Sequence, residues 1–217
     1  MADHEELEIP DQLPDYSSPE YWDDRYTTEP EASYDWLISY SQLRPIIIPR
    51  LHDNYDAEIL VVGCGNSSLS EDLYKDGYKN ITNIDFSSTV IAQMGDKYKM
   101  YEEMDFSVMD ACNLQYPQGC FSVVIDKGTL DCVLCGEQSF QRANAMLQGI
   151  YRALQPGGVY ILVSYGMPDT RIGYLKSKYL TWTVEQAKLS KMRLEHFANY
   201  EVSQYHYIYI CTKQGEA

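Results

Sequence analysis

The sequence lacks several features that would assign it to other classes of protein. No stretch approaches the roughly 18 consecutive apolar residues of a membrane-spanning helix, and the opening MADHEELEIP lacks the basic, then apolar, pattern of a signal peptide. Six cysteines are too sparse for a secreted disulfide scaffold. We therefore expect a cytoplasmic protein with reduced thiols and no membrane association.

A basic stripe, which nucleic-acid-binding proteins use to neutralise phosphates, is also missing. The formal net charge is -15. Residues 1–36 hold 12 acidic side chains against one basic side chain, so they carry -11 and the remaining chain carries -4. This acidity is typical of a solubilising tail, and the alternative is attraction of a basic partner. We expect no direct contact with nucleic acid.

The cysteines do not show the spacing of a zinc site. Cys132 and Cys135 form one C-x-x-C, but no second Cys or His pair stands at zinc-finger spacing. Their apolar surroundings favour a role as small hydrophobic residues over a metal or redox role.

What is present indicates one folded domain. The 217 residues are 45% hydrophobic and 13% aromatic, which is enough for a buried core. Residues 1–18 are acidic and weakly periodic, as in a flexible arm. The aromatic residues between Tyr21 and Leu51 lie among helix-compatible residues and predict two or three short helices that end near Pro45 and Pro49.

Short apolar strands alternate with amphipathic helices over the rest of the chain. We expect strands at 58–62, 80–85, 103–108, 121–126 and 159–164, and an antiparallel pair at 193–202 and 205–211. A capping box at Ser68–Glu71 begins one helix, and Val90, Ile91 and Met94 mark the core face of the next. Helical spacing also marks a longer helix, through Phe140, Ala143, Leu147, Ile150 and Leu154, which Pro156-Gly157-Gly158 ends. This alternation predicts a mostly parallel sheet with helices on both faces.

The residues that follow each strand carry the chemical signal, because ligands bind beyond the carboxyl ends of such strands. Gly63-Cys64-Gly65-Asn66-Ser67 allows backbone amides to approach a ligand, although it lacks the lysine of a phosphate loop and the third glycine of a dinucleotide site. Asp85 stands where an acid accepts from ribose hydroxyls, and helix capping is its alternative. Asp110 and Ala111 are suited to the edge of an adenine. Together they predict a nucleoside-bearing cofactor.

These residues resemble a known family. Val61–Gly65, Asp85, Asp110 and Leu154–Gly158 are similar to the successive motifs of class I S-adenosylmethionine-dependent methyltransferases. More specifically, Tyr21–Tyr26, Tyr34–Trp36, Gly63–Ser67 and Asp126–Asp131 resemble the methyltransferase-like subgroup that methylates lysine in translation elongation factor 1-alpha. The resemblance, over about 16–213, implies a Rossmann-like α/β fold with seven strands, the last of them antiparallel. It further implies one domain, 19–217, with lid helices at about 19–51.

The resemblance also implies which residues bind S-adenosyl-L-methionine and its product S-adenosyl-L-homocysteine. These residues are Trp22, Tyr26, Trp36, Gly63, Gly65, Asp85, Phe86, Asp110, Ala111 and Lys127. Gly63 would face the methionine part, Asp85 the ribose and Phe86 the adenine. The three aromatic residues from the first helices would form a lid, and core packing is their alternative. Lys127 is expected to pair with the cofactor carboxylate or with an acid such as Asp131.

Methyl transfer to an amine is an in-line displacement that needs a deprotonated nucleophile held in position. Asp126 and Asp131 are the candidates to take the proton, although Asp126 can equally cap the next helix. The turn Asp126–Thr129 departs from the Asn/Asp-Pro-Pro-Tyr/Phe turn of other amine methyltransferases, which disfavours adenine-N6 and glutamine substrates. Tyr205, Tyr207 and Tyr209 share one face and would either surround a methylammonium or pack in the sheet.

The leading hypothesis is a monomeric protein-lysine methyltransferase that acts on translation elongation factor 1-alpha. A small-molecule methyltransferase on the same scaffold and an inactive cofactor-binding adaptor stay open, and a nicotinamide oxidoreductase is a more distant alternative.

Overall fold

The computed structural model describes residues 14–29, 35–190 and 205–215, and the structural statements below concern these residues. The strands are β1 (Ile59–Val62), β2 (Ile81–Asp85), β3 (Met104–Val108), β4 (Phe121–Lys127), β5 (Leu154–Ser164), β6 (Trp182–Ser190) and β7 (Tyr205–Lys213). The helices are α1 (Pro19–Thr28), α2 (Tyr40–Leu51), α3 (Leu69–Lys75), α4 (Ser88–Lys97), α5 (Thr129–Val133), α6 (Ser139–Ala153), α7 (Pro168–Leu175) and the 3-10 helix η1 (Ala111–Asn113).

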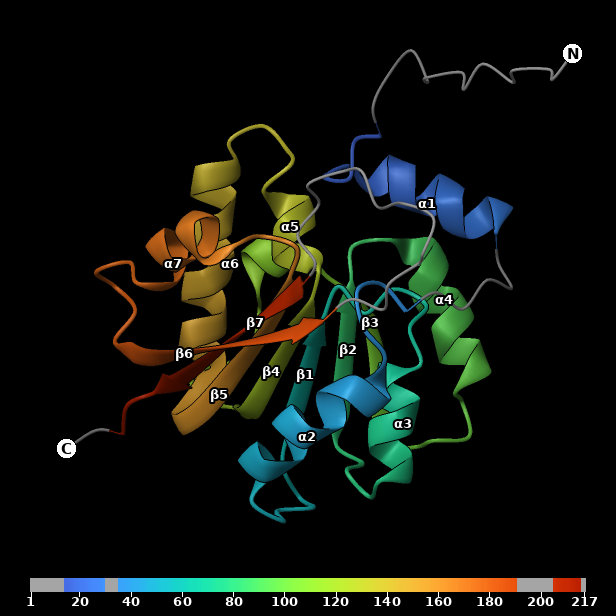
Figure 1. Ribbon diagram of the computed structural model, residues 1–217. Helices are drawn as coiled ribbons and strands as arrows, with labels where there is room; N and C mark the ends of the chain where they lie inside the picture. Colours follow the sequence, from blue (N-terminus) through green and yellow to red (C-terminus); the bar gives the residue numbers. More distant parts are fainter. Residues whose placement is uncertain (1–13, 30–34, 191–204, 216–217) are drawn as a thin grey trace, which may run out of the picture.

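The strands form one seven-stranded sheet in the order β3-β2-β1-β4-β5-β7-β6 (Figure 1). Strands β1 to β5 are mutually parallel, and β7 lies antiparallel between β5 and β6. The expected fold, with its antiparallel last strand, is therefore confirmed. The chain order reverses between β1 and β4, and a crevice opens beyond the carboxyl ends of strands at such a reversal.

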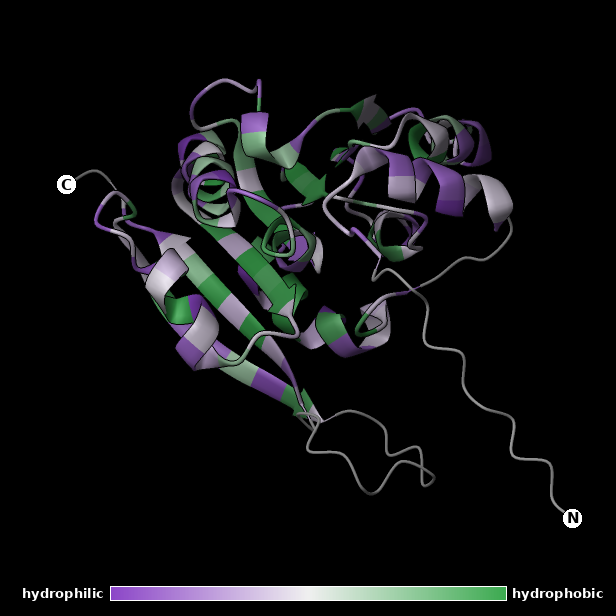
Figure 2. Ribbon diagram, turned by 90° about the horizontal axis from the view of Figure 1, so that it is seen from above, coloured by the Kyte–Doolittle hydropathy of each residue, from purple (hydrophilic) through white to green (hydrophobic). Residues whose placement is uncertain are grey.

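Both faces of the sheet are covered, as the apolar runs predict. Successive side chains of a strand point to opposite faces, so Ile59 and Val61 join the core beneath α1 to α4 while Leu60 and Val62 join the core beneath α5 to α7. The central strands are strongly apolar where the helices cover them (Figure 2). Among the described residues, none of the helices combines the length and the hydropathy that crossing a bilayer demands.

Helix α2 corrects the prediction that the N-terminal helices end near Pro45 and Pro49, because both prolines lie inside it. The two rings stand four residues apart on the exposed side, where lost backbone hydrogen bonds can be made to water. The opposite side buries Leu43, Ile47 and Leu51 in the core. Burial of these three side chains outweighs the helix-breaking tendency of the prolines.

Two details of the other helices also differ from expectation. Helix α3 begins where predicted, but Ser68 makes no capping hydrogen bond, and the amide of Leu69 donates instead to Ser67 Oγ at 3.2 Å. In α6, Ala143, Leu147 and Ile150 are buried as expected, whereas Phe140 is 64% exposed. Phe140 stands in the first turn and lies against Tyr174 of α7.

The C-terminal part of the sheet contains a strand that the sequence did not reveal. Strand β6 pairs antiparallel with β7, from Trp182 opposite Lys213 to Ser190 opposite Tyr205. The predicted strand at 193–202 and its two-residue turn lie outside the described residues. Strand β5 starts earlier than the predicted Val159, because Leu154 already pairs with Phe121 across a register shift.

Candidate active site

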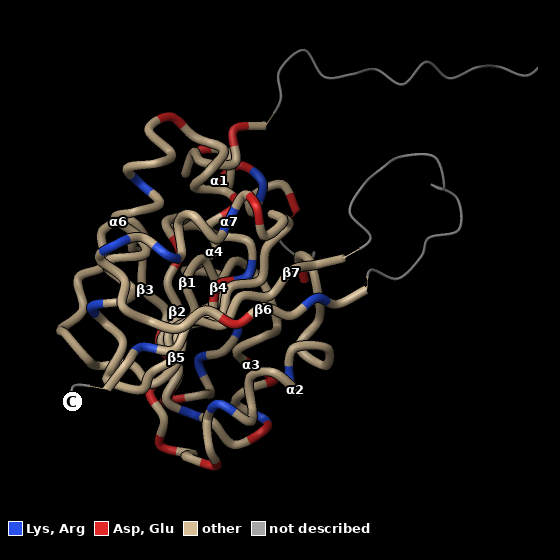
Figure 3. Tube along the Cα trace, turned by 60° about the vertical axis from the view of Figure 1, so that its left-hand side comes forward, with Lys and Arg blue, Asp and Glu red and all other residues tan. Residues whose placement is uncertain are grey.

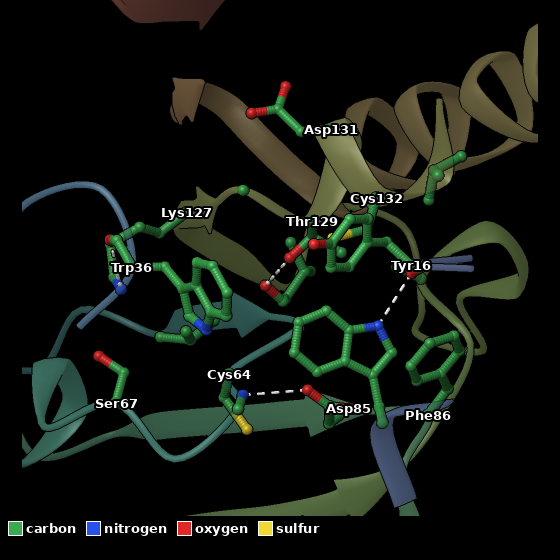
Figure 4. Close-up of a pocket in the computed structure, with 18 of the residues that line it drawn as sticks. Tyr16, Trp36, Cys64, Ser67, Asp85, Phe86, Lys127, Thr129, Asp131 and Cys132 are labelled. Carbon is green, nitrogen blue, oxygen red and sulfur yellow. Dashed lines mark hydrogen bonds between the residues drawn. The ribbon is translucent and has the colours of Figure 1, made fainter. Parts of the chain in front are cut away.

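A cavity of about 510 Å³ opens at the carboxyl ends of β1, β2 and β4 (Figure 4). All ten residues that the sequence analysis assigns to the cofactor line this one cavity: Trp22, Tyr26, Trp36, Gly63, Gly65, Asp85, Phe86, Asp110, Ala111 and Lys127. Of the two proposed proton acceptors, Asp131 lines it and Asp126 does not. The fold thus brings together residues that are more than 100 positions apart in the chain.

The loop after β1 depends on its glycines for shape and for space. Gly63 has φ +58° and lies so close to Thr129 that an added Cβ would stand 2.1 Å from the Thr129 hydroxyl oxygen. That hydroxyl donates to the carbonyl of Val62 at 2.9 Å and ties α5 to the end of β1. Gly65 has φ +51° and lies beneath the hydroxyl of Tyr26. Only glycine fits such positions without strain.

Asp85 ends β2 inside the cavity wall and is 6% exposed. Its two oxygens accept from the amides of Gly65 and Ser87, each at 3.0 Å, so the carboxylate joins the glycine loop to the turn before α4. Burial raises the pKa of Asp85 to about 6, against the pull of these amides. Each carboxylate oxygen has two lone pairs, so acceptor capacity remains for a ligand hydroxyl. Local bracing and ligand binding are therefore compatible roles for this residue.

Asp110 and Ala111 form the wall that follows β3. Asp110 caps the 3-10 helix, since its Oδ1 accepts from the Cys112 amide at 2.8 Å. Its Oδ2 faces Arg142 of α6 at 3.5 Å. Arg142 also lines the cavity, and its buried Nε has no hydrogen-bond partner within the described structure.

The aromatic cover consists of Tyr16, Trp22, Tyr26 and Trp36. Trp22 stacks on Tyr26 with ring centroids 5.7 Å apart, meets Trp36 edge to face at 5.9 Å, and donates from its indole to the carbonyl of Tyr16 at 2.9 Å. Trp22 and Tyr26 are also part of the buried core. The lid and core-packing interpretations thus describe the same side chains, which line the cavity on one side and pack on the other.

Helix α1 is attached to the turn that follows Asp85. Asp23 accepts from the Ser87 hydroxyl at 2.5 Å and from the Thr89 amide at 3.1 Å. Gln93 donates to the carbonyl of Tyr26 at 2.9 Å. The cover is therefore held on the same turn whose preceding residue, Asp85, reaches into the cavity.

Lys127 pairs with an acid, as one of the two expectations has it, but this acid is Asp35 and not Asp131. Its ammonium lies 3.5 Å from Asp35 and donates to the carbonyl of Trp36 at 3.1 Å, and its side chain is only 7% exposed. Asp35 also accepts from the hydroxyl of Ser67. The end of β4 approaches the segment that precedes α2, whereas Asp131 on α5 turns toward β5. Burial lowers the pKa of Lys127, and Asp35 opposes that shift.

Asp126 lies behind the cavity wall, with no exposed surface. It accepts from the amide of Thr129 at 2.8 Å, the amide of Leu130 at 3.2 Å and the hydroxyl of Tyr160 at 2.8 Å. Burial raises the pKa of Asp126 to about 7. This position favours the capping interpretation, because a proton acceptor must reach the proton it removes.

Asp131 holds the segment after β5 in place. It accepts from the amide of Tyr165 at 2.8 Å, from the hydroxyl of Ser164, and from Arg171 Nη2 at 2.8 Å. The side chains of Asp131 and Arg171 are 14% and 13% exposed, so their charges compensate one another at the cavity wall. Because three donors already engage this carboxylate, its geometry suits positioning better than proton transfer.

The tyrosines of β7 and the C-x-x-C cysteines are the two remaining groups that the sequence analysis singles out. Tyr209 is fully buried and donates to the carbonyl of Gly166 at 2.7 Å, and none of Tyr205, Tyr207 and Tyr209 lines the cavity, which favours sheet packing. Cys132 and Cys135 both line the cavity, and burial raises the pKa of Cys132 to about 12. The described residues contain no cluster of three metal-ligating side chains.

Sequence reasoning missed several residues of this cavity or its support, among them Tyr16, Asp35, Tyr165 and Arg171. Tyr165 directly follows the fifth strand, so the strand-end rule that selected Asp85 and Asp110 applies to it equally. Asp35 lies within the quoted Tyr34–Trp36 motif. Tyr16 and Arg171 carry no local signal, because only their partners Trp22 and Asp131 bring them to the cavity.

Comparisons with known proteins agree with this fold and cavity. Residues 60–162 match the family described as "Methyltransferase domain". N-methyltransferase NodS from Bradyrhizobium japonicum, solved with S-adenosyl-L-homocysteine, superimposes with a TM-score of 0.65 at 16% identity, over 93% of this chain and 99% of NodS. The fold and the cavity define a class I S-adenosylmethionine-dependent methyltransferase.

Two curated relatives narrow the family. EEF1A lysine methyltransferase 4 from Mus musculus is 32% identical over 199 residues, which are 88% of this chain and 77% of that protein. The human eEF1A lysine and N-terminal methyltransferase is 36% identical over 159 residues, which are 72% of this chain but only 22% of that longer protein. The chain belongs to the same family as EEF1A lysine methyltransferase 4.

The residues present fit the cofactor of this class. The cavity volume lies within the roughly 300 to 1,000 Å³ of sites for cofactors and small molecules. The buried carboxylate of Asp85 suits hydroxyl donors, the aromatic cover suits a cationic sulfonium, and the loop of Gly63 and Gly65 brings backbone to the cavity wall. S-adenosylmethionine supplies the methyl group when bound, and the assigned contact of each residue stays a prediction.

Proposed function

We propose that the protein is a lysine methyltransferase whose acceptor is translation elongation factor 1-alpha. The observation that carries this proposal is the 32% identity to EEF1A lysine methyltransferase 4 over most of both chains. The aromatic walls of the cavity add physical support, because aromatic faces attract an ammonium and admit the aliphatic stem of lysine.

The proton of the acceptor lysine has to leave before methyl transfer, because an ammonium has no lone pair. Asp126 is buried behind the cavity wall and Asp131 is paired with Arg171, so neither is free to serve as the base. Burial in this cavity lowers the pKa of Lys127 despite a nearby acid. We infer that the same cavity lowers the pKa of an entering lysine, which then loses its proton to water at the mouth.

The remaining catalytic contribution is positioning. Transfer from a sulfonium to a neutral amine proceeds by in-line displacement, and a held near-attack geometry can lower the barrier by about 7 to 11 kcal/mol. The aromatic cover and the segment held by Asp131 enclose the cavity from two sides, which supports this mode of action.

The test is incubation of the purified protein with isotopically labelled S-adenosylmethionine and recombinant elongation factor 1-alpha, followed by peptide mass spectrometry. We expect label on lysine of the factor and none with Asp85→Ala. A parallel reaction supplies a cell lysate in place of the factor. Label confined to small metabolites of that lysate would identify a small-molecule methyltransferase instead. Binding of S-adenosyl-L-homocysteine without turnover on either acceptor class would identify an adaptor.

A further inference from the structure

Large apolar side chains stand exposed where β5 leads into α7. Tyr165 and Met167 are each 50% exposed, and Tyr165 lines the cavity. Phe140, at the start of α6, is 64% exposed and lies against Tyr174 of α7, with ring centroids 5.9 Å apart. We call Phe140, Tyr165, Met167 and Tyr174 the apolar rim. Tyr165, Met167 and Tyr174 follow one another along one segment, and Phe140 contacts its end. Exposed apolar groups that adjoin in this way mark interaction sites more often than single ones.

The backbone beneath the apolar rim is held from several sides. Asp131 accepts from the Tyr165 amide at 2.8 Å, Tyr209 donates to the Gly166 carbonyl at 2.7 Å, and the Gly166 amide donates to the Ser164 hydroxyl at 2.9 Å. The guanidinium of Arg171 lies so close to Gly166 that an added Cβ would stand 2.2 Å from it. A surface that is ordered beforehand loses little entropy when a partner binds.

The charges around the rim favour a cationic partner. The acids Asp15, Glu137 and Asp169 are exposed; Glu137 precedes Phe140 by three positions, and Asp169 follows Met167 by two. Asp15 lies near enough to Cys135, a cavity residue, to act on its thiol, and Asp169 acts in the same way on Tyr209. Two arginines also line the cavity, and each faces an acid: Arg171 lies 2.8 Å from Asp131, and Arg142 lies 3.5 Å from Asp110. Acidic groups around an apolar surface complement a basic segment that also carries an apolar side chain.

We propose that the apolar rim docks the segment of the protein substrate that flanks the acceptor lysine. The segment is basic and places a large apolar side chain beside the lysine. This inference rests on the proposed function, because it assigns a surface to the same acceptor.

The dimensions of the rim limit where that apolar side chain stands. Tyr165 marks the cavity mouth, and Tyr174 lies seven residues beyond Met167, or about 10 Å along the α7 axis. An extended chain covers that length in about three residues. The apolar neighbour therefore stands within about three positions of the lysine.

The experiment compares Met167→Ser and Phe140→Ser with Met100→Ser, whose side chain is 70% exposed after α4, away from the cavity. We expect the KM for elongation factor 1-alpha to rise about tenfold in the first two variants, with kcat and the affinity for S-adenosyl-L-homocysteine unchanged. Met100→Ser is expected to match the wild type. An unchanged KM in rim variants that still bind S-adenosyl-L-homocysteine overturns the inference.

Two further measurements keep the outcome unambiguous. Hydrogen exchange of the unmodified enzyme, with S-adenosyl-L-homocysteine and the factor, should gain protection at 165–174, and no gain there contradicts the rim. Sedimentation that shows a dimer abolished by Met167→Ser would assign the surface to a second copy of this chain and overturn the proposal. If the unmodified enzyme leaves the factor unlabelled, the proposed function fails, whereas labelling with an unchanged KM removes only the docking surface.

Discussion

Asp85 has two roles: its carboxylate accepts hydrogen bonds that hold the glycine loop, and it lines the cofactor cavity. Burial raises its pKa to about 6, so the free enzyme gains a proton on this group as the pH falls below that value. A neutral carboxyl accepts hydroxyl hydrogen bonds poorly, and affinity for S-adenosyl-L-homocysteine should then fall by up to about tenfold per pH unit. Calorimetry between pH 5 and 8 measures this dependence.

Asp85→Asn is the matched control for that titration. It should lower affinity at pH 8 by about 1.5 to 3 kcal/mol and remove the dependence on pH below 6. An Asn variant that keeps full affinity would refute the ribose assignment.

For Asp126 we predict an effect on the stability of the fold and none on the rate of methyl transfer. Its pKa rises from the ordinary carboxyl value to about 7 on folding, so the folded state binds the extra proton between about pH 4 and 7. Its contribution to stability is full below that window and is lost as the pH rises through it, by at most about 1.4 kcal/mol per unit. The difference in unfolding free energy between wild type and Asp126→Asn should show this slope in urea titrations.

The turnover rate of Asp126→Asn distinguishes a helix-capping role of Asp126 from a role as the general base. General base catalysis contributes about 100-fold to 10,000-fold, so a base would be lost with Asp126→Asn. We expect a change in kcat of less than about tenfold. A larger loss in a variant with intact cofactor affinity would return Asp126 to the proton path.

At the scale of elements, two prolines destabilise α2 while the burial of its opposite side stabilises it. Pro45→Ala restores a backbone donor in the exposed interior of the helix and should raise the unfolding free energy by about 1 to 2 kcal/mol, after the loss of proline rigidity in the unfolded chain is deducted. Pro19→Ala is the control, because Pro19 occupies the first helical position, where proline fits. Equal effects of the two substitutions would contradict this account of α2.

The elements also show what local sequence can and cannot predict. The four-residue run of β1 and the buried stripe of α6 are predictable, because burial on both faces or on one side imposes a pattern on the sequence itself. Strand β6 cannot be predicted from local sequence, because an edge strand with mixed exposure has few apolar residues. It forms because it pairs with β7. Within the site, strand-end acids are predictable, whereas the pairing of Lys127 with Asp35 depends on tertiary approach.

At the scale of the whole molecule, the charge of -15 is unevenly divided along the chain. Acidic and basic positions are interspersed over the folded body, with several acidic ones in and near α1 (Figure 3). An acidic N-terminus should speed the approach of a basic protein substrate, and salt should screen that effect because the Debye length is about 10 Å at 0.1 M. We expect kcat/KM for the elongation factor to fall several-fold between 0.05 and 0.3 M salt.

Replacement of Asp3, Glu5, Glu6, Glu8 and Asp11 by their amides keeps the length of the N-terminus and serves as the control. The neutralised variant should lose much of the salt dependence and keep its affinity for S-adenosyl-L-homocysteine. An identical salt dependence in both proteins would assign the acidic residues to solubility alone.

The attachment of α1 to the turn after Asp85 has a consequence for the timing of turnover. We expect spent product to leave past the aromatic cover, and such an opening would break the hydrogen bonds of Asp23 to Ser87 and Thr89. The residence time of S-adenosyl-L-homocysteine should therefore be set by how often α1 detaches. In stopped-flow displacement, Asp23→Ala should speed the dissociation of S-adenosyl-L-homocysteine more than its association. Detachment of α1 would then set the rate of product release.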